Sequence, residues 1–126
     1  MSNRSYDPGE HRVKHCWGES QAGFSRQGDI LIGKCPATLT RGMAQQLLDE
    51  ALSDPPETLD PKRLYTVHQG VVYEAVESNG AWHGYPWRYR PGRRALSRQL
   101  LARLQARAQA AGDLKAFQRW IKEHGR

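Results

Sequence analysis

The dipeptide Asn79-Gly80 limits what this chain can fold into more than any other feature of the sequence. Both central positions of a type I′ hairpin turn take a positive φ, and Asn-Gly is a strongly favoured pair there. A second turn signal, Gln69-Gly70, lies upstream, and β-branched and aromatic residues flank both turns. The segment from Leu64 to Trp87 is therefore predicted to form a three-stranded antiparallel meander.

Two-residue turns also predict the register of this meander, because turn type and loop length determine which residues face each other. One face of the sheet would then carry Glu74 and His83 as diagonal neighbours, with Tyr85 directly opposite Glu74. A slip of one residue would move all three to the other face. The predicted pairs are Ser78 with Ala81, Val76 with His83, Glu74 with Tyr85, His68 with Val71, and Val67 with Val72.

The remaining elements follow from apolar runs and capping residues. The β-branched run from Ile30 to Cys35 predicts a buried strand that ends at Pro36. Thr40 is the expected N-cap of a first helix, since its hydroxyl can accept a hydrogen bond from the first turn. After Pro91-Gly92 a second helix is predicted from Arg93 to Ala111, and Asp113 is expected to begin a short third helix.

This order of elements, β-α-β-β-β-α-α, predicts an α+β fold. The expected architecture is a small, mostly antiparallel sheet with the helices packed on one face. A length of 126 residues favours a single domain over residues 1–126. Within it, residues 1–10 are expected to be loosely ordered, and the proline-rich stretch 54–62 is expected to be a loop.

Charge is distributed unevenly along the chain. The formal net charge is +6, yet residues 78–112 contain no Asp or Glu and seven arginines. A stretch of this kind attracts anionic partners, so nucleic acid (RNA or DNA) or an acidic protein surface is the expected partner. The second partner class stays open because protein interfaces favour the same residues, Trp, Tyr and Arg.

Aromatic residues alternate with the arginines in the same stretch. Arginine can hold phosphates with its planar fork, and aromatic rings can stack on bases. The competing interpretation is that the rings belong to the core, where large aromatic residues are mostly buried. The predicted nucleic-acid-binding residues are Tyr85, Trp87, Arg88, Tyr89, Arg90, Arg93, Arg94 and Arg98.

A catalytic alternative rests on Glu74 and His83. A carboxylate beside a histidine can act as a general base and acid, and Arg88 could stabilise developing negative charge. The three residues together would suit a metal-independent nuclease or toxin-like domain. The competing interpretation is an ordinary cross-strand polar pair on a solvated face.

No cofactor loop or metal-ligand array is recognised, so neither a cofactor nor a metal is expected. His11, His15, Cys16 and Cys35 could in principle supply zinc ligands, but they lack the Cys-x-x-Cys spacing that anchors such sites. Residues 1–14 have no apolar run typical of a signal peptide, and no apolar segment of the sequence is long enough to span a membrane. A cytoplasmic protein that does not bind membranes is therefore the expectation.

Overall fold

The structure is a computed structural model that describes residues 21–27, 30–36 and 39–125. The expectations for residues 1–10, His11, His15 and Cys16 lie outside these ranges. The elements confirm the α+β class, and their order follows the prediction with one strand added at the start. They are β1 (Gly23–Gln27), β2 (Ile30–Lys34), α2 (Arg41–Asp49), β3 (Arg63–His68), β4 (Val71–Ser78), β5 (Ala81–Pro86), α3 (Arg98–Ala110) and α4 (Leu114–His124).

The predicted meander is present as the antiparallel sheet β3-β4-β5. Its register is the predicted one: Glu74 pairs with Tyr85, Val76 with His83, and the remaining predicted pairs also form. Both turns have two central residues with positive φ, at 54° and 79° for Asn79 and Gly80. The register prediction is confirmed because each turn has the backbone conformation that its sequence favours.

The predicted strand before the first helix is confirmed as β2, but it does not join the meander. It pairs instead with β1 in a separate two-stranded antiparallel sheet. No strand was predicted over β1, because Phe24 is its only large apolar residue and its other residues are small or polar. β2 lies close to the end of β5, where a Cβ on Gly33 would be 2.8 Å from the carbonyl oxygen of Pro86.

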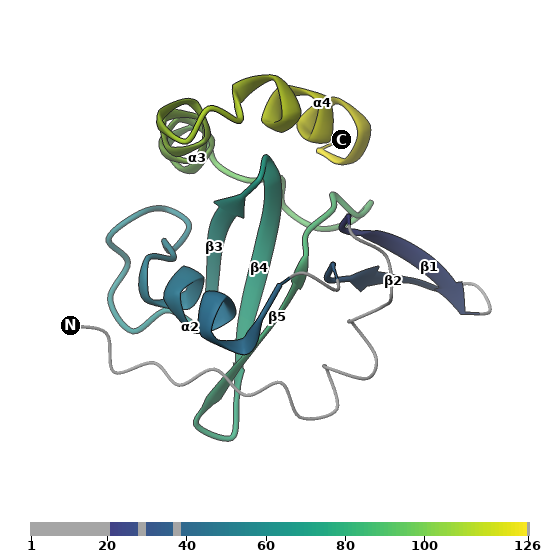
Figure 1. Cartoon of the computed structure of the whole chain (residues 1–126). Helices are drawn as coiled ribbons and strands as arrows, with labels where there is room; N and C mark the ends of the chain where they lie inside the picture. Colours follow the sequence, from purple (N-terminus) through teal and green to yellow (C-terminus); the bar gives the residue numbers. More distant parts are fainter. Residues whose placement is uncertain (1–20, 28–29, 37–38, 126) are drawn as a thin grey trace.

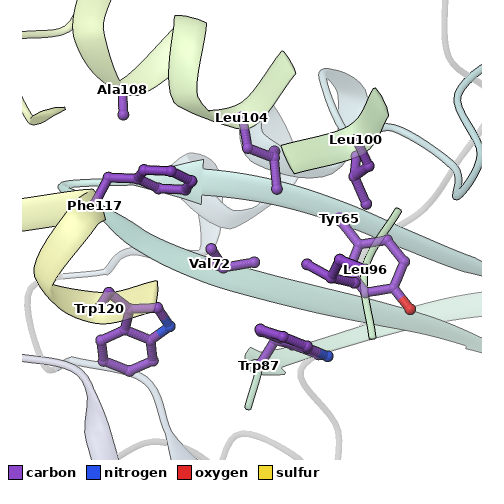
Figure 2. Close-up of a cluster of buried hydrophobic side chains, with 9 residues drawn as sticks. All are labelled: Tyr65, Val72, Trp87, Leu96, Leu100, Leu104, Ala108, Phe117 and Trp120. Atoms are coloured by element: carbon purple, nitrogen blue, oxygen red, sulfur yellow. The ribbon is translucent and has the colours of Figure 1, made fainter. Parts of the chain in front are cut away.

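Helices lie on both faces of the meander, whereas the sequence predicted one face. One face contributes Tyr65 and Val72 to a core shared with α3 and α4, which lie next to each other in Figure 1. The opposite face contributes Leu64 and Trp82 to a second core that α2 covers. The cause is that side chains alternate between the two faces of a strand, and both faces carry apolar residues that need a covering element. Figure 2 shows the larger core, formed by Tyr65, Val72, Trp87, Leu96, Leu100, Leu104, Ala108, Phe117 and Trp120.

The helix boundaries follow from capping. Thr40 is the N-cap of α2, as predicted, and its hydroxyl accepts a hydrogen bond from the Met43 amide at 3.1 Å. The predicted helix from Arg93 begins later, at Arg98, because Ser97 is its N-cap and accepts from the Leu100 amide at 3.1 Å. The Ser97 amide in turn donates to Asp54 Oδ2 at 3.1 Å. Residues 93–97 are therefore a connecting segment and not the first turn of α3.

The turn between β3 and β4 leads to a prediction about Gly70, whose φ is +82°. A Cβ there would lie 2.5 Å from the Ala116 Cβ of α4, whereas Gly80, with a φ of +79°, has no atom within 4 Å of such a Cβ. We expect Gly80→Ala to cost about 1 kcal/mol through backbone strain alone. Gly70→Ala should cost about 2–4 kcal/mol, because overpacking against α4 adds to the strain. Urea denaturation of both variants measures the difference, and equal losses would contradict the close approach of this turn to α4.

Candidate nucleic-acid interface

The arginine-rich segment after β5 is held in place at several points along its length. The Trp87 amide donates to the carbonyl oxygen of Val72 at 2.8 Å, and the Tyr89 amide donates to that of His124 at 2.7 Å. The segment then turns at Gly92, which has a φ of +84°, and joins the N-cap of α3. Arg88, Arg90, Arg93 and Arg94 are therefore carried by a backbone segment tied to β4 and to the end of α4.

These four arginines, here called the arginine rim, differ from those along α3. Arg103 is 3.7 Å from Glu57 Oε1, and Arg107 donates to the carbonyl oxygen of Glu50, so both are directed toward the connection between α2 and β3. The arginine rim has no such partner: across the described residues, no carboxylate forms an ion pair with any of the four. Three of them, Arg90, Arg93 and Arg94, are exposed.

Glu74 lies beside the arginine rim as a buried carboxylate with three donors. The Tyr65 hydroxyl donates to Oε2 at 2.8 Å, the Tyr85 hydroxyl donates to Oε1, and Arg63 Nη1 donates to Oε1 at 3.2 Å. Glu74 is only 3% exposed. Burial, followed by the negative charge of Glu74 and the hydrogen bond to it, raises the pKa of both tyrosines, so both hydroxyls keep their protons and act as donors. The sequence analysis did not identify Tyr65 or Arg63 as partners of Glu74.

Three hollows follow one another along the arginine rim. The first, the Glu74 cavity, has a volume of about 30 Å³ and is lined by Glu74, its two tyrosines and the whole arginine rim. The second, the Arg93 cleft, has a volume of about 670 Å³ and combines Arg93 and Arg94 with Lys62 and Arg63. The third, the Trp120 cleft, has a volume of about 680 Å³ and lies between β1 and α4.

The three hollows adjoin because they share lining residues. Tyr65, Arg93 and Arg94 line both the Glu74 cavity and the Arg93 cleft. Phe24 and Arg88 line both the Glu74 cavity and the Trp120 cleft. The result is one hollowed track beside residues 88–94, and at least one residue of the arginine rim lines each of its parts.

The predicted binding residues are divided between this track and the core. Trp87 is 7% exposed and packs in the larger core, so its ring is not available to stack on a base. Tyr89 is half-buried against the same core, and Tyr85 is half-buried with its hydroxyl on Glu74. Arg98 is exposed at the first residue of α3 but lines none of the three hollows. The exposed residues of the predicted binding set are therefore arginines and not aromatic residues.

The structure places the two predicted catalytic residues, Glu74 and His83, on the same sheet face as diagonal neighbours. Glu74 and Arg88 line one cavity, whereas His83 is not among the residues that line it. A catalytic role for this set stays a prediction. Cys35, the fourth candidate zinc ligand, is buried, and its thiol donates to the carbonyl oxygen of Gly84 at 3.9 Å. Within the described part of the chain, no group of three or more His, Cys, Asp or Glu residues could hold a metal ion.

Comparison with protein-family models, curated proteins and solved structures found no match to this chain. A search of the described residues for a helix long and apolar enough to cross a membrane also found none.

Proposed function

We propose that this protein binds nucleic acid along the hollowed track, with the arginine rim holding the phosphates. The observation that carries the proposal is that four arginine residues line one cavity and form no ion pair with a carboxylate among the described residues. An arginine that is not already paired keeps its donors for a ligand, and its planar fork matches a phosphate group. The carboxylate in the cavity, Glu74, is already hydrogen-bonded to Tyr65, Tyr85 and Arg63, which reduces its repulsion of an anion.

Two further features favour nucleic acid over a small anion. Lys62 and Arg63 line the Arg93 cleft together with Arg93 and Arg94, so cationic residues come from two separate parts of the chain. Several adjoining hollows with positive charge suit a ligand that carries several phosphates in sequence. Asp54 also lines the Arg93 cleft, but its Oδ2 accepts from the Ser97 amide at the start of α3, where a negative charge is stabilised by the helix dipole.

The experiment compares two double variants that change the net charge equally. Arg93→Ala/Arg94→Ala removes two arginines of the rim, and Arg103→Ala/Arg107→Ala removes two that contact Glu57 and the Glu50 carbonyl. Fluorescence anisotropy with labelled single-stranded and duplex RNA and DNA gives the affinity at several salt concentrations. We expect the first variant to bind single strands at least about tenfold more weakly, with a log–log salt slope smaller by about 1.4, or roughly 0.7 for each lost phosphate contact.

The control variant should keep the wild-type salt slope. Equal losses in both double variants would show only a general effect of net charge, and would contradict a role for the rim. An absence of binding to any of the four nucleic acids at about 50 mM salt would overturn the proposal, because non-specific electrostatic binding is strongest at low salt. Cleavage of the RNA during the incubation, abolished by Glu74→Gln, would instead identify the nuclease alternative.

A further inference from the structure

Among the residues that the structure describes, two buried N–H donors in or near α4 have no hydrogen-bond partner. Across the described residues, Trp120 Nε1 and Arg88 Nε are both buried and both lack an acceptor. Trp120 is 8% exposed. Leaving a donor of this kind unsatisfied is costly, and nearly all buried polar groups in folded proteins have a partner. The position of the two donors in the fold indicates why they have no acceptor within the described part of the protein.

Both residues line the same hollow, the Trp120 cleft. Phe24 connects them: its ring stacks on that of Trp120, with centroids 5.7 Å apart, and the Arg88 guanidinium carbon lies 6.0 Å from the same ring. The His124 ring packs against both aromatic rings, with its centroid 4.1 Å from that of Trp120 and 4.9 Å from that of Phe24. In Figure 2 the indole nitrogen of Trp120 is on the side of the ring that faces Trp87. Arg88 and Trp120 thus both lie beside the ring of Phe24.

The charges around this group favour an anion. Arg88 and Arg119 both line the Trp120 cleft. Burial lowers the pKa of the Arg88 guanidinium, and the neighbouring charge of Arg90 lowers it further, so an anion beside it would relieve both effects. The carboxylate that lines the cleft is Glu123, which is 58% exposed and lies 3.7 Å from His124 Nε2. It therefore lies at the outer edge of the cleft, beside a histidine, and accepts a hydrogen bond from neither of the two buried donors.

We propose that the Trp120 cleft binds a phosphate group of the nucleic-acid strand, which accepts hydrogen bonds from Trp120 Nε1 and Arg88 Nε. This inference rests on the proposed function, and it extends the path of the strand past the arginine rim to α4. Phosphate is the expected acceptor because several oxygens can accept from both donors and face Arg119 at once. A strand can reach this position because the Trp120 cleft adjoins the Glu74 cavity through Phe24 and Arg88.

The test follows the indole N–H signal of Trp120 by nitrogen–proton NMR on the full chain. The chain has four tryptophans, each of which gives one such signal, and the signal of Trp120 is the one that disappears in Trp120→Phe. Sequential assignment identifies it if that variant does not fold. Inorganic phosphate and a single-stranded oligonucleotide are titrated in separate experiments. Trp82 is the internal control, because it is buried in the second core on the opposite face of the meander.

We expect the oligonucleotide to shift the Trp120 signal and to leave that of Trp82 in place. Trp120→Phe should bind the strand about tenfold more weakly, which is the effect of losing one hydrogen bond to a charged group, while Trp82→Phe should bind as wild type does. The salt slope should not change in Trp120→Phe, because no charge is removed.

The other outcomes overturn the inference and separate it from the proposed function. If anisotropy shows strand binding but the Trp120 signal does not move, the strand binds elsewhere and only the inference fails. If inorganic phosphate moves the signal and the strand does not, the cleft is a site for free anions and not for the strand. If the strand does not bind at all, the proposed function fails together with the inference.

Discussion

Replacement of Leu104 by alanine is expected to lower the free energy of unfolding by about 2–5 kcal/mol. Leu104 is fully buried on α3, in the core that this helix shares with the meander and α4 (Figure 2). The loss has two parts: the transfer free energy of the removed atoms and the cavity that remains when the surroundings cannot collapse. A domain of this size has a total stability of about 5–15 kcal/mol, so the effect is a large share of it.

Leu59 provides the matched control for this variant. The same substitution at Leu59, which is 92% exposed, should change the free energy of unfolding by less than about 0.5 kcal/mol. Urea denaturation of both variants gives the two values, and an unchanged m-value would show that the change is one of stability. A loss below about 1 kcal/mol for Leu104→Ala would mean that α3 does not pack on the meander as described.

Replacement of Glu74 by alanine is expected to cost about 2–4 kcal/mol, although it removes a charged residue from the interior. The change leaves the hydroxyls of Tyr65 and Tyr85 without their acceptor, and each lost partner of a buried polar group costs about 1–3 kcal/mol. Arg63 also loses its partner, but its side chain is 43% exposed, so water can take over part of that contact.

Glu77 provides a control on the same strand, with an ion pair of the same length. Glu74 and Glu77 each lie 3.2 Å from a cationic nitrogen, but the Glu77 side chain is 30% exposed and its partner Lys62 is 66% exposed. Glu77→Ala should therefore cost less than about 1 kcal/mol. Thermal or urea denaturation at neutral pH separates the two variants. Equal losses would show that burial and the two tyrosines add nothing to the contribution of Glu74.

The meander shows how much of this fold could be predicted locally. Its turns are short, and the φ preferences of Asn79 and Gly80 determine how the strands pair, so the register follows from neighbouring residues. The N-cap of α2 at Thr40 and the start of α4 after Asp113 likewise depend on residues that are close together in the sequence. The start of α3 was predicted five residues too early, because its N-cap depends on Ser97 and on a contact from Asp54, which is distant in the sequence.

The sequence indicated which types of residue make up the candidate site, but not which individual residues belong to it. The carboxylate-free stretch contains all four residues of the arginine rim, and the predicted register placed Glu74 opposite Tyr85. The pattern did not distinguish Arg94, which is exposed without a carboxylate partner in the described residues, from Arg107, which contacts the Glu50 carbonyl. Nor did it distinguish Trp87, a core residue, from a stacking surface. Trp120 and its neighbours were not identified at all as a site.

The amino-acid sequence by itself determined the α+β class, the pairing of β3, β4 and β5, and the excess of positive charge in residues 78–112. These properties depend on turns, periodicity and composition, which act between residues close together in the chain. Only the tertiary structure decided that helices cover both faces, that Trp87 is buried, and that Arg88 and Trp120, each with a buried donor, line one cleft. The reason is that burial and charge pairing depend on which distant segments pack together, and many packings are compatible with the same local pattern.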